Sequence, residues 1–381
     1  MADHHYDIII CGGGVAGLYL GARLKRAGYN LIVIEKNTLG HGQTLASQGM
    51  IHGGQKYALG GGGDHAAAIA AMPSRWDDCL NGYGDVLLND VAVLGESQIM
   101  FPAGNMLSRF STFAAAWAVR GRTVRLKQKY YPAPVMTGPV YEMHEKVLDV
   151  KSLLANLAAQ LDDRLVMGDV TEMLPDGQVA VNGVTMQAQV VIFTAGLGNE
   201  DALRLLRVDG QQTQRRPLRQ VMVKTMEHPV FGHGIVNAPK PRATITSHPY
   251  DDGYVWYMGG NIAEQGAKMT AYETIAFARA EMADMFPHVD WAGKLWATHA
   301  VDRAEAYNAD GHLPPGPVVQ QRGRVMVCWP TKLTFAPLLS DKIYERLQQF
   351  DIAPSAPTPA PAWPQPGIGQ YPWEVATWQT F

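Results

Sequence analysis

Three glycines close to the N-terminus have the spacing of a loop that holds a dinucleotide. Gly12, Gly14 and Gly17 follow an apolar run and precede a helical pattern. In such a loop the first glycine permits a sharp turn, the second removes the side chain that would block a pyrophosphate, and the third lets the helix pack closely on the strand. The N-terminus of that helix presents N–H groups and a partial positive charge to the phosphates.

A carboxylate stands where such a site needs one. Glu35 follows the loop at the spacing of about twenty residues at which an acidic side chain accepts hydrogen bonds from an adenosine ribose. The same charge would repel a 2′-phosphate, so NADP is disfavoured. The elements that position it are a strand at residues 6–11, a helix at 15–27 that ends at Gly28, and a buried strand at 31–34. This order of elements predicts dinucleotide binding.

Composition narrows the class of protein. The 381 residues are 47% hydrophobic with a formal net charge of −3, which allows a sizeable core and gives no electrostatic footprint for nucleic acid or an anionic membrane. No apolar run approaches the roughly 20 residues that a membrane-spanning helix needs. The first strand begins too early to leave room for a signal peptide, so we expect a cytoplasmic protein. Cys11, Cys79 and Cys328 are far apart and without metal-ligand spacing, so we expect reduced thiols and no metal.

The pattern along the chain predicts an α/β fold. We expect a Rossmann-like lobe that binds the cofactor, with a mixed-sheet α+β lobe inserted to hold the substrate. The first lobe is predicted at residues 1–85, 145–210 and 295–350, and the second at 86–144 and 211–294. Residues 190–194 form a buried run that ends in Ala195 and Gly196, where small residues allow close approach to the cofactor. From Leu295 the chain is expected to return to the first lobe.

The last residues, 351–381, form a segment rich in proline. Its prolines favour an extended course, so composition alone favours a disordered linker. Its aromatic side chains are Trp363, Tyr371, Trp373, Trp378 and Phe381. Because large aromatic side chains dominate packing where they dock, we expect an ordered strap along this chain or across a second subunit.

Several landmarks occur together in a fixed order. They are Gly12, Gly14 and Gly17, then Glu35, the segment 43–57 with its Ile51-His52-Gly53-Gly54 run, Thr194-Ala195-Gly196 and Lys332-Leu333-Thr334. This order resembles the FAD-dependent D-amino-acid oxidase superfamily. The local likeness is to the flavin-linked glycerol-3-phosphate dehydrogenases and, more loosely, to the L-2-hydroxyglutarate oxidases. The resemblance implies FAD as the cofactor.

The resemblance also implies roles for the matching positions. Cofactor contacts are implied for Gly12, Gly14, Gly17, Glu35, Lys36, Thr44, Ser47, Val170, Ala195, Gly196, Leu333 and Thr334. Catalytic or substrate contacts are implied for His52, Lys56, Tyr57, Arg303 and Lys332. In this scheme Thr44 and Ser47 lie near the phosphates, and Val170 offers backbone hydrogen bonds to adenine. Arg303 reaches the anionic group of the substrate.

For two of these residues, Lys332 and His52, general chemistry also supports the role that the resemblance implies. Hydride arrival on a flavin develops negative charge at its pyrimidine edge, which Lys332 and nearby backbone N–H groups would stabilise. His52 has an ordinary pKa near 6.5, suited to a general base that takes the substrate's hydroxyl or ammonium proton. Covalent attachment of His52 to the flavin is the competing role, and a histidine satisfied within the core is the plain one.

We therefore expect oxidation of a C–H bond next to a hydroxyl or amino group of a small anionic substrate. Oxygen, a quinone or a carrier protein would reoxidise the flavin, and nothing in the sequence decides among these acceptors or fixes the oligomeric state. Two other classes remain open at this point: an NAD-dependent dehydrogenase, and a flavin-binding scaffold or maturation protein without turnover.

Overall fold

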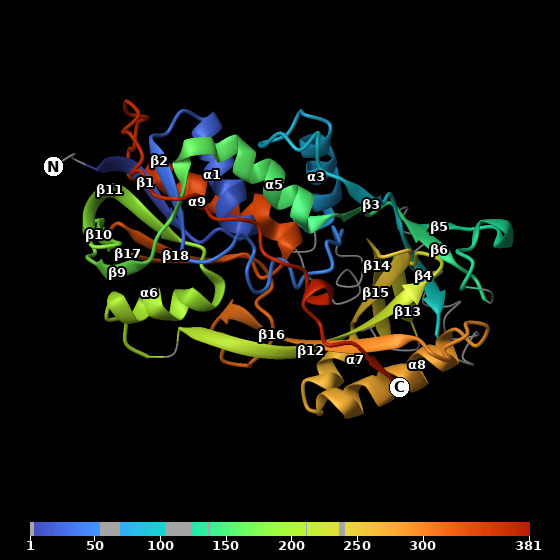
Figure 1. The fold of residues 1–381 in the computed structure, drawn as a ribbon. Coiled ribbons are helices and arrows are strands. Elements are labelled where there is room, and N and C mark those ends of the chain that lie inside the picture. The colour runs from blue at the N-terminus through green and yellow to red at the C-terminus, as the bar shows by residue number, and fades with distance from the viewer. Residues whose placement is uncertain (1–3, 54–68, 104–122, 136–137, 211, 236–240) are drawn as a thin grey trace.

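A computed structural model of the chain describes residues 4–53, 69–103, 123–135, 138–210, 212–235 and 241–381. Within these residues the chain forms two lobes that lie side by side, each built on one large β-sheet (Figure 1). The predicted α/β fold class is confirmed.

The first sheet contains the predicted Rossmann-like strands. Its order is β17 (Val318–Arg322), β18 (Val325–Trp329), β11 (Val184–Phe193), β1 (His5–Cys11), β2 (Leu31–Glu35) and β8 (Leu165–Met167), with β10 (Gln178–Val181) and β9 (Val170–Met173) continuing from β11. The five strands from β18 to β8 are parallel. Their carboxyl ends therefore meet at one edge of the sheet, where α/β proteins bind their ligands.

Alternate side chains of β1 enter two different cores. Ile8 and Ile10 pack with α1 (Val15–Arg26), α5 (Val150–Leu161) and α9 (Ala336–Gln349) on one face, and α3 (Met72–Leu80) joins this layer. Ile9 and Cys11 pack on the other face with β9, β10 and α6 (Asn199–Leu205). Since a strand alternates its side chains, a sheet covered on both faces needs an unbroken apolar run. Asp149 caps α5 by accepting a hydrogen bond from the Ser152 N–H at 2.7 Å.

The second sheet is mixed and lies in the other lobe. Its order is β19 (Gln379–Thr380), β16 (Leu295–Ala306), β12 (Thr213–Met226), β15 (Gly253–Gly259), β14 (Ala243–Tyr250), β13 (Gly232–Ile235), β4 (Gln98–Pro102), β6 (Tyr141–Met143) and β5 (Thr123–Arg125). Helices α7 (Asn261–Gly266) and α8 (Ala271–Met285) cover one face. Strands β3 (Val93–Gly95) and β7 (Val147–Leu148) pair with each other near the junction of the lobes. Short 3₁₀ turns are η2 (Gln128–Tyr130), η3 (Asp162–Arg164), η4 (Gly196–Gly198), η5 (Leu333–Phe335) and η6 (Pro372–Glu374).

The expected return of the chain to the first lobe at Leu295 is wrong. Strand β16 begins at this residue and pairs along its whole length with β12 in the second sheet. The chain re-enters the first sheet only at β17, which begins at Val318. The apolar residues of β16 do not indicate which sheet the strand joins. Its sheet is determined by pairing with β12, a strand far away in the sequence.

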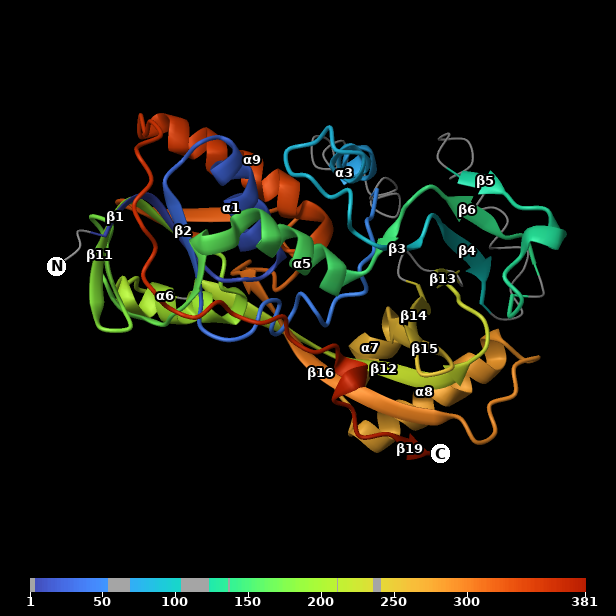
Figure 2. The ribbon, with the colours of Figure 1, turned by 45° about the horizontal axis from the view of Figure 1, so that its top comes forward.

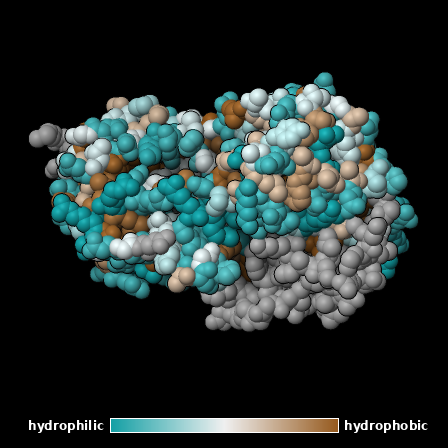
Figure 3. Space-filling model, turned by 90° about the horizontal axis from the view of Figure 1, so that it is seen from below, coloured by the Kyte–Doolittle hydropathy of each residue, from teal (hydrophilic) through white to brown (hydrophobic). Residues whose placement is uncertain are grey.

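The other face of the second sheet points toward the first lobe. Met222 of β12 and Tyr257 of β15 are opposite each other and belong to the same apolar core as α1 and α5. The two lobes therefore share one core, and side chains on this face lie between them. Seen from below, the coloured part of the surface is mostly hydrophilic, with hydrophobic residues in small groups (Figure 3).

The C-terminal strap, residues 351–381, runs from the first lobe to the second (Figure 2, red). At the first lobe it is held by backbone bonds and by side chains: Met167 N–H donates to Pro364 O, Leu39 pairs with the strap through Gly367 O and Gly369 N–H, and the Tyr371 hydroxyl donates to Asp149 at 3.0 Å. At the second lobe Trp373 lies on the ring of His248, with 4.2 Å between the ring centroids. Strand β19 then pairs with the start of β16. The strap is docked on its own chain.

Candidate functional site

The turn between β1 and α1 is closed by backbone contacts that leave no room for side chains. Gly12 has φ +119°, and a Cβ there would lie 2.8 Å from the backbone of Thr194. A Cβ on Gly17 would lie 2.0 Å from the Gly12 carbonyl oxygen. These two glycines are therefore required by the packing of β1, β11 and α1.

Gly14 stands in a different environment. Among the described residues a Cβ at this position would contact only the Thr44 hydroxyl, at 3.1 Å. Gly14 is the N-cap residue of α1 and supplies no side-chain cap, while the Val15 N–H donates to Thr44 Oγ1 at 3.3 Å. The Ser47 hydroxyl donates to the Thr44 carbonyl at 2.7 Å. The helix N-terminus, Thr44 and Ser47 thus form one group able to hold an anion.

The Glu35 carboxylate lies against this turn. It accepts hydrogen bonds from the Gly13 N–H at 2.6 Å and the Asn37 N–H at 2.8 Å. Lys36 follows it on the surface, and Val170 begins β9 opposite Val181. The loop that carries Lys36 continues to Leu39, the residue paired with the C-terminal strap.

Two further segments end at the same edge of the first sheet. Ala195 and Gly196 directly follow β11, and the Ala195 N–H donates to Asn199 Oδ1 at 3.0 Å. Lys332 and η5 follow β18. The residues predicted to contact the cofactor at the ends of β1, β11 and β18 are therefore brought to one side of the molecule.

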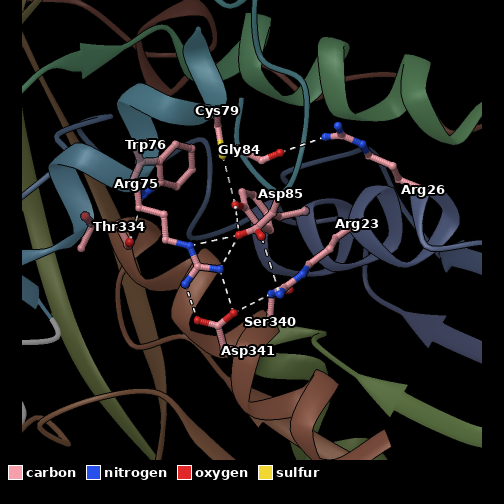
Figure 4. Close-up of polar contacts among 11 residues, drawn as sticks. Arg23, Arg26, Arg75, Trp76, Cys79, Gly84, Asp85, Thr334, Ser340 and Asp341 are labelled. Atoms are coloured by element: carbon pink, nitrogen blue, oxygen red, sulfur yellow. Dashed lines mark hydrogen bonds and ion pairs between the residues drawn. The ribbon is translucent and has the colours of Figure 1, made fainter. Parts of the chain in front are cut away.

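The turn that carries Lys332 is held from behind by α3. The Trp76 indole N–H donates to the Thr334 carbonyl at 3.0 Å, and the Thr334 hydroxyl donates to the His52 carbonyl at 3.4 Å. Arg75, the residue before Trp76, pairs with Asp85 and with Asp341 of α9 (Figure 4). Burial raises the pKa of the Asp341 carboxyl, but hydrogen bonds from Arg75 and Arg23 outweigh it and hold the pKa below its ordinary value. This charge network fixes α3, and with it the turn at Thr334.

Lys332 lies among other charged groups. Burial, and after it the charges of Arg216 and Arg303, together lower the pKa of Lys332 to about 8, with Glu145 acting in the opposite direction. Arg216 on β12 and Arg303 on β16 are opposite each other in the register of the two strands. Arg216 has the same parity on β12 as Met222, so both arginines share the face that points toward the first lobe. Arg216 also pairs with the buried carboxylate of Glu305, with Nε 2.7 Å from Oε2.

His52 approaches this group from the first lobe. Its Nδ1 lies 3.8 Å from Oε2 of Glu145, a carboxylate whose side chain is only 5% exposed. The ring of His233 from β13 lies 5.8 Å from the ring of His52, centroid to centroid. His233 in turn contacts Gln98 and Thr244, each at 3.0 Å. A basic ring, a carboxylate and a cluster of cations thus come together between the lobes.

Sequence reasoning predicted part of this group and missed the rest. His52, Arg303 and Lys332 are brought together, whereas Lys56 and Tyr57 lie outside the described residues. Glu145, His233 and Arg216 were missed. The short motif Gly232-His233-Gly234 is the one local hint, because flanking glycines allow close approach. His248, expected on the substrate-lobe sheet, is buried beneath Trp373 and so belongs to the packing of the strap.

Comparison with known proteins identifies the family. The model of the DAO family, FAD dependent oxidoreductase, matches residues 7–338. The probable FAD-dependent oxidoreductase PA4991 of Pseudomonas aeruginosa is 41% identical over 382 residues, covering 97% of this chain and 98% of its own. Its crystal structure has a TM-score of 0.86 at 36% identity, covering 98% and 99% of the two chains. The chain belongs to the DAO family of FAD-dependent oxidoreductases.

More distant structures share the fold. Glycine oxidase of Geobacillus kaustophilus has a TM-score of 0.62 at 17% identity, covering 94% of this chain and 99% of its own. L-alpha-glycerophosphate oxidase of Mycoplasma pneumoniae, solved with FAD bound, has a TM-score of 0.66 at 16% identity, covering 93% and 98%.

Family membership makes this protein an enzyme with FAD as its cofactor, as predicted. The NAD-dependent and scaffold alternatives are set aside. In the described part of the chain no helix is long and apolar enough to cross a membrane. The same residues contain no group of three or more His, Cys, Asp or Glu side chains that could hold a metal ion.

Proposed function

We propose that this enzyme oxidises a C–H bond next to a hydroxyl or amino group of a small anionic substrate, with FAD as the acceptor of hydride. When bound, FAD supplies the two-electron acceptor that no amino-acid side chain provides. The chain's own residues bind the substrate, orient it and take its proton. His52 is the proposed base, and Arg303 is the proposed partner of the substrate's anionic group.

The described residues fit such a cofactor at both ends. Gly14 leaves open space beside the N-terminus of α1, which suits a pyrophosphate, and the Glu35 carboxylate beside it suits a ribose. At the other end we assign Lys332 to the reduced ring, whose negative charge a cation would stabilise. We assign Lys36, Val170, Ala195 and Gly196 to the cofactor surface between these ends, and Leu333 and Thr334 to the ring end.

One observation carries the choice of an anionic substrate. The charges of Arg216 and Arg303 act on the buried ammonium of Lys332, so three cations lie in one region. The carboxylates that face them are those of Glu145 and Glu305. Repulsion among like charges disfavours such a group: after burial, which is the largest cause, the charges of Arg216 and Arg303 contribute to the lowered pKa of Lys332. A substrate carboxylate or phosphate relieves this repulsion, so the site favours an anion over a neutral molecule.

Anaerobic reduction of the yellow enzyme tests the proposal. The protein is mixed without oxygen with 2-hydroxy acids, amino acids and polyol phosphates, and the loss of flavin absorbance is followed. We expect one of these classes to bleach the flavin, and an uncharged amide or ester of the same compound to fail. Equal bleaching by the uncharged analogue would contradict the anionic assignment, and no bleaching by any class would contradict the proposed oxidation.

A pair of arginine variants locates the anionic group. Arg303→Met should weaken substrate binding by roughly 10–100-fold, the effect of losing a hydrogen bond to a charged group. Arg215→Met is the matched control, because Arg215 lies on β12 beside Arg216 but pairs with Glu200 at the surface. If both variants keep the substrate affinity of the wild type, Arg303 does not bind the anion.

A further inference from the structure

The segment that carries His52 is paired with the segment that carries Glu145. The Ile51 N–H donates to the Lys146 carbonyl at 2.9 Å, and the Leu148 N–H donates to the Gly49 carbonyl at 2.9 Å. Met50 and Val147 form an antiparallel bridge between these two bonds. This short ladder fixes the backbone on both sides, so Glu145 is delivered to His52 by hydrogen bonds and not by side-chain packing alone.

Gly53 gives the carboxylate its room. The Gly53 N–H donates to Glu145 Oε1 at 2.6 Å, and a Cβ on Gly53 would lie 2.8 Å from that same oxygen. The glycine after His52 therefore makes space for a buried carboxylate. With Oε1 held by the backbone, the other oxygen, Oε2, lies 3.8 Å from His52 Nδ1, which is an ion-pair distance and longer than a hydrogen bond.

We propose that Glu145 is the positioning residue of the base: its negative charge favours the proton of His52 on Nδ1, so that Nε2 is the nitrogen that takes the substrate's proton. This inference rests on the proposed role of His52 and deepens it. A neutral histidine has one protonated ring nitrogen, and the group that faces the other nitrogen decides which one it is. A buried carboxylate at Nδ1 also stabilises the imidazolium that forms when Nε2 accepts a proton.

Proton transfer to His52 accounts for the second hydrogen that the proposed oxidation removes from the substrate. As the C–H hydrogen leaves with its electron pair for the acceptor, the hydroxyl or ammonium proton goes to Nε2 of His52. An alcohol substrate becomes a carbonyl and an ammonium substrate becomes an iminium ion, and Glu145 stays ionised throughout. Glu145 contributes by orientation and charge and does not itself exchange a proton.

Cations face the same place and oppose the effect of Glu145 on His52. Among the described residues, the charged and titratable groups around it are Glu145 between β6 and β7, His233 on β13, Lys332 after β18, Arg303 and Glu305 on β16, and Arg216 on β12. The absolute pKa of His52 is the sum of these influences. The test therefore uses the protonated nitrogen in the wild type and the change in pKa when only Glu145 is altered.

The first measurement needs no substrate and no activity. Nitrogen NMR of the FAD-bound enzyme labelled in its histidines, with His52→Asn to assign the signal, reports which nitrogen of neutral His52 carries the proton. We expect Nδ1. In Glu145→Gln the pKa of His52 should fall by about one pH unit or more, the effect of removing a nearby opposite charge. A proton on Nε2 in the wild type would overturn the proposal even if the variant fails to fold.

The second measurement follows flavin reduction against pH. In Glu145→Gln the limiting rate should fall by roughly 10²-fold, the low end of general-base catalysis, with the base ionisation shifted to lower pH. Glu142→Gln is the matched control, because Glu142 lies three residues earlier and accepts from Ser97 Oγ at 2.6 Å. A change confined to KM in Glu145→Gln would mean that Glu145 contacts the substrate instead of positioning His52. An unchanged His52 pKa would mean that Glu145 serves only the stability of the fold. Because the NMR result stands without turnover, failure of this inference is distinguishable from failure of the proposed oxidation.

Discussion

The turn between β1 and α1 is made of backbone, whereas the opposite end around Lys332 is made of side chains from separate segments. At the turn, Gly12 and Gly17 are excluded from carrying any side chain by contacts as short as 2.0 Å. Around Lys332, charged residues arrive from β12, β16 and the loop between β6 and β7. A backbone site depends on spacing along the chain, and a side-chain site depends on how distant strands pair.

The largest effects, on stability and on flavin binding, are expected from substitutions of Gly17 and Gly14, two glycines of the same motif. Gly17→Ala places a Cβ 2.0 Å from the Gly12 carbonyl, so we expect loss of more than about 4 kcal/mol of stability. Gly14→Val instead adds a branched side chain on the open side of the turn, so the protein should fold but remain colourless. Thermal unfolding and flavin absorbance of the two variants separate these outcomes. Normal yellow colour in Gly14→Val would show that the pyrophosphate does not lie beside Gly14.

This contrast explains what the sequence could and could not predict. The strand, turn, helix and strand up to Glu35 are local, and their glycine spacing and apolar runs predicted them correctly. Arg216 faces Arg303 because β12 and β16 pair in one register across 87 positions of the chain, a distance at which no local pattern operates. Glu145 is placed by a ladder with residues 49–51, and its own neighbourhood in the sequence gives no hint of that partner.

The C-terminal strap docks on both lobes. It meets the first lobe through backbone bonds at Leu39 and side-chain bonds such as that of Tyr371 to Asp149, and the second lobe through the buried side chain of Trp373 against His248. Trp373→Ala removes a fully packed indole, so we expect a loss of about 3–5 kcal/mol in the free energy of unfolding. Trp378→Ala is the control, since Trp378 is only partly buried. Denaturant unfolding measures both, and equal, small losses would mean that the strap contributes little to stability.

Lys332 is predicted to reduce stability while serving the reaction. Its pKa is about 8 in the fold against about 10.4 in an unfolded chain, so between these values the unfolded state binds more protons. Stability therefore rises with pH across this window, and below about pH 8 the buried charge costs stability. Lys332→Met should stabilise the FAD-free protein by about 1–3 kcal/mol at pH 7 and flatten that rise.

The same variant should slow flavin reduction by roughly 10–100-fold and lower the flavin potential, because the cation proposed to stabilise reduced flavin is gone. Lys268→Met, at an exposed lysine, is the control for both measurements. If Lys332→Met is destabilised and its flavin potential is unchanged, Lys332 has a structural role. The contrast between the backbone turn at β1 and the side-chain group around Lys332 would then be weaker.

The smallest expected effect concerns the aromatic contact between the strap and the second sheet. Burial lowers the pKa of His248 to about 3, so the unfolded state binds its proton from about pH 6.5 downward while the folded state does not. His248 therefore favours the fold above pH 6.5, and this contribution is lost as the pH falls toward 3. At pH 5.5 the loss amounts to about 1.4 kcal/mol, one pH unit below the ordinary pKa.

His248→Phe keeps an aromatic ring beneath Trp373 and cannot titrate, so its stability should fall less steeply between pH 6.5 and 5. The exposed His228 in His228→Gln is the matched control and should keep the slope of the wild type. Parallel slopes in all three proteins would mean that the contact beneath Trp373 opens to water before the protein unfolds, so that side-chain docking of the strap is looser than its backbone bonds at Leu39.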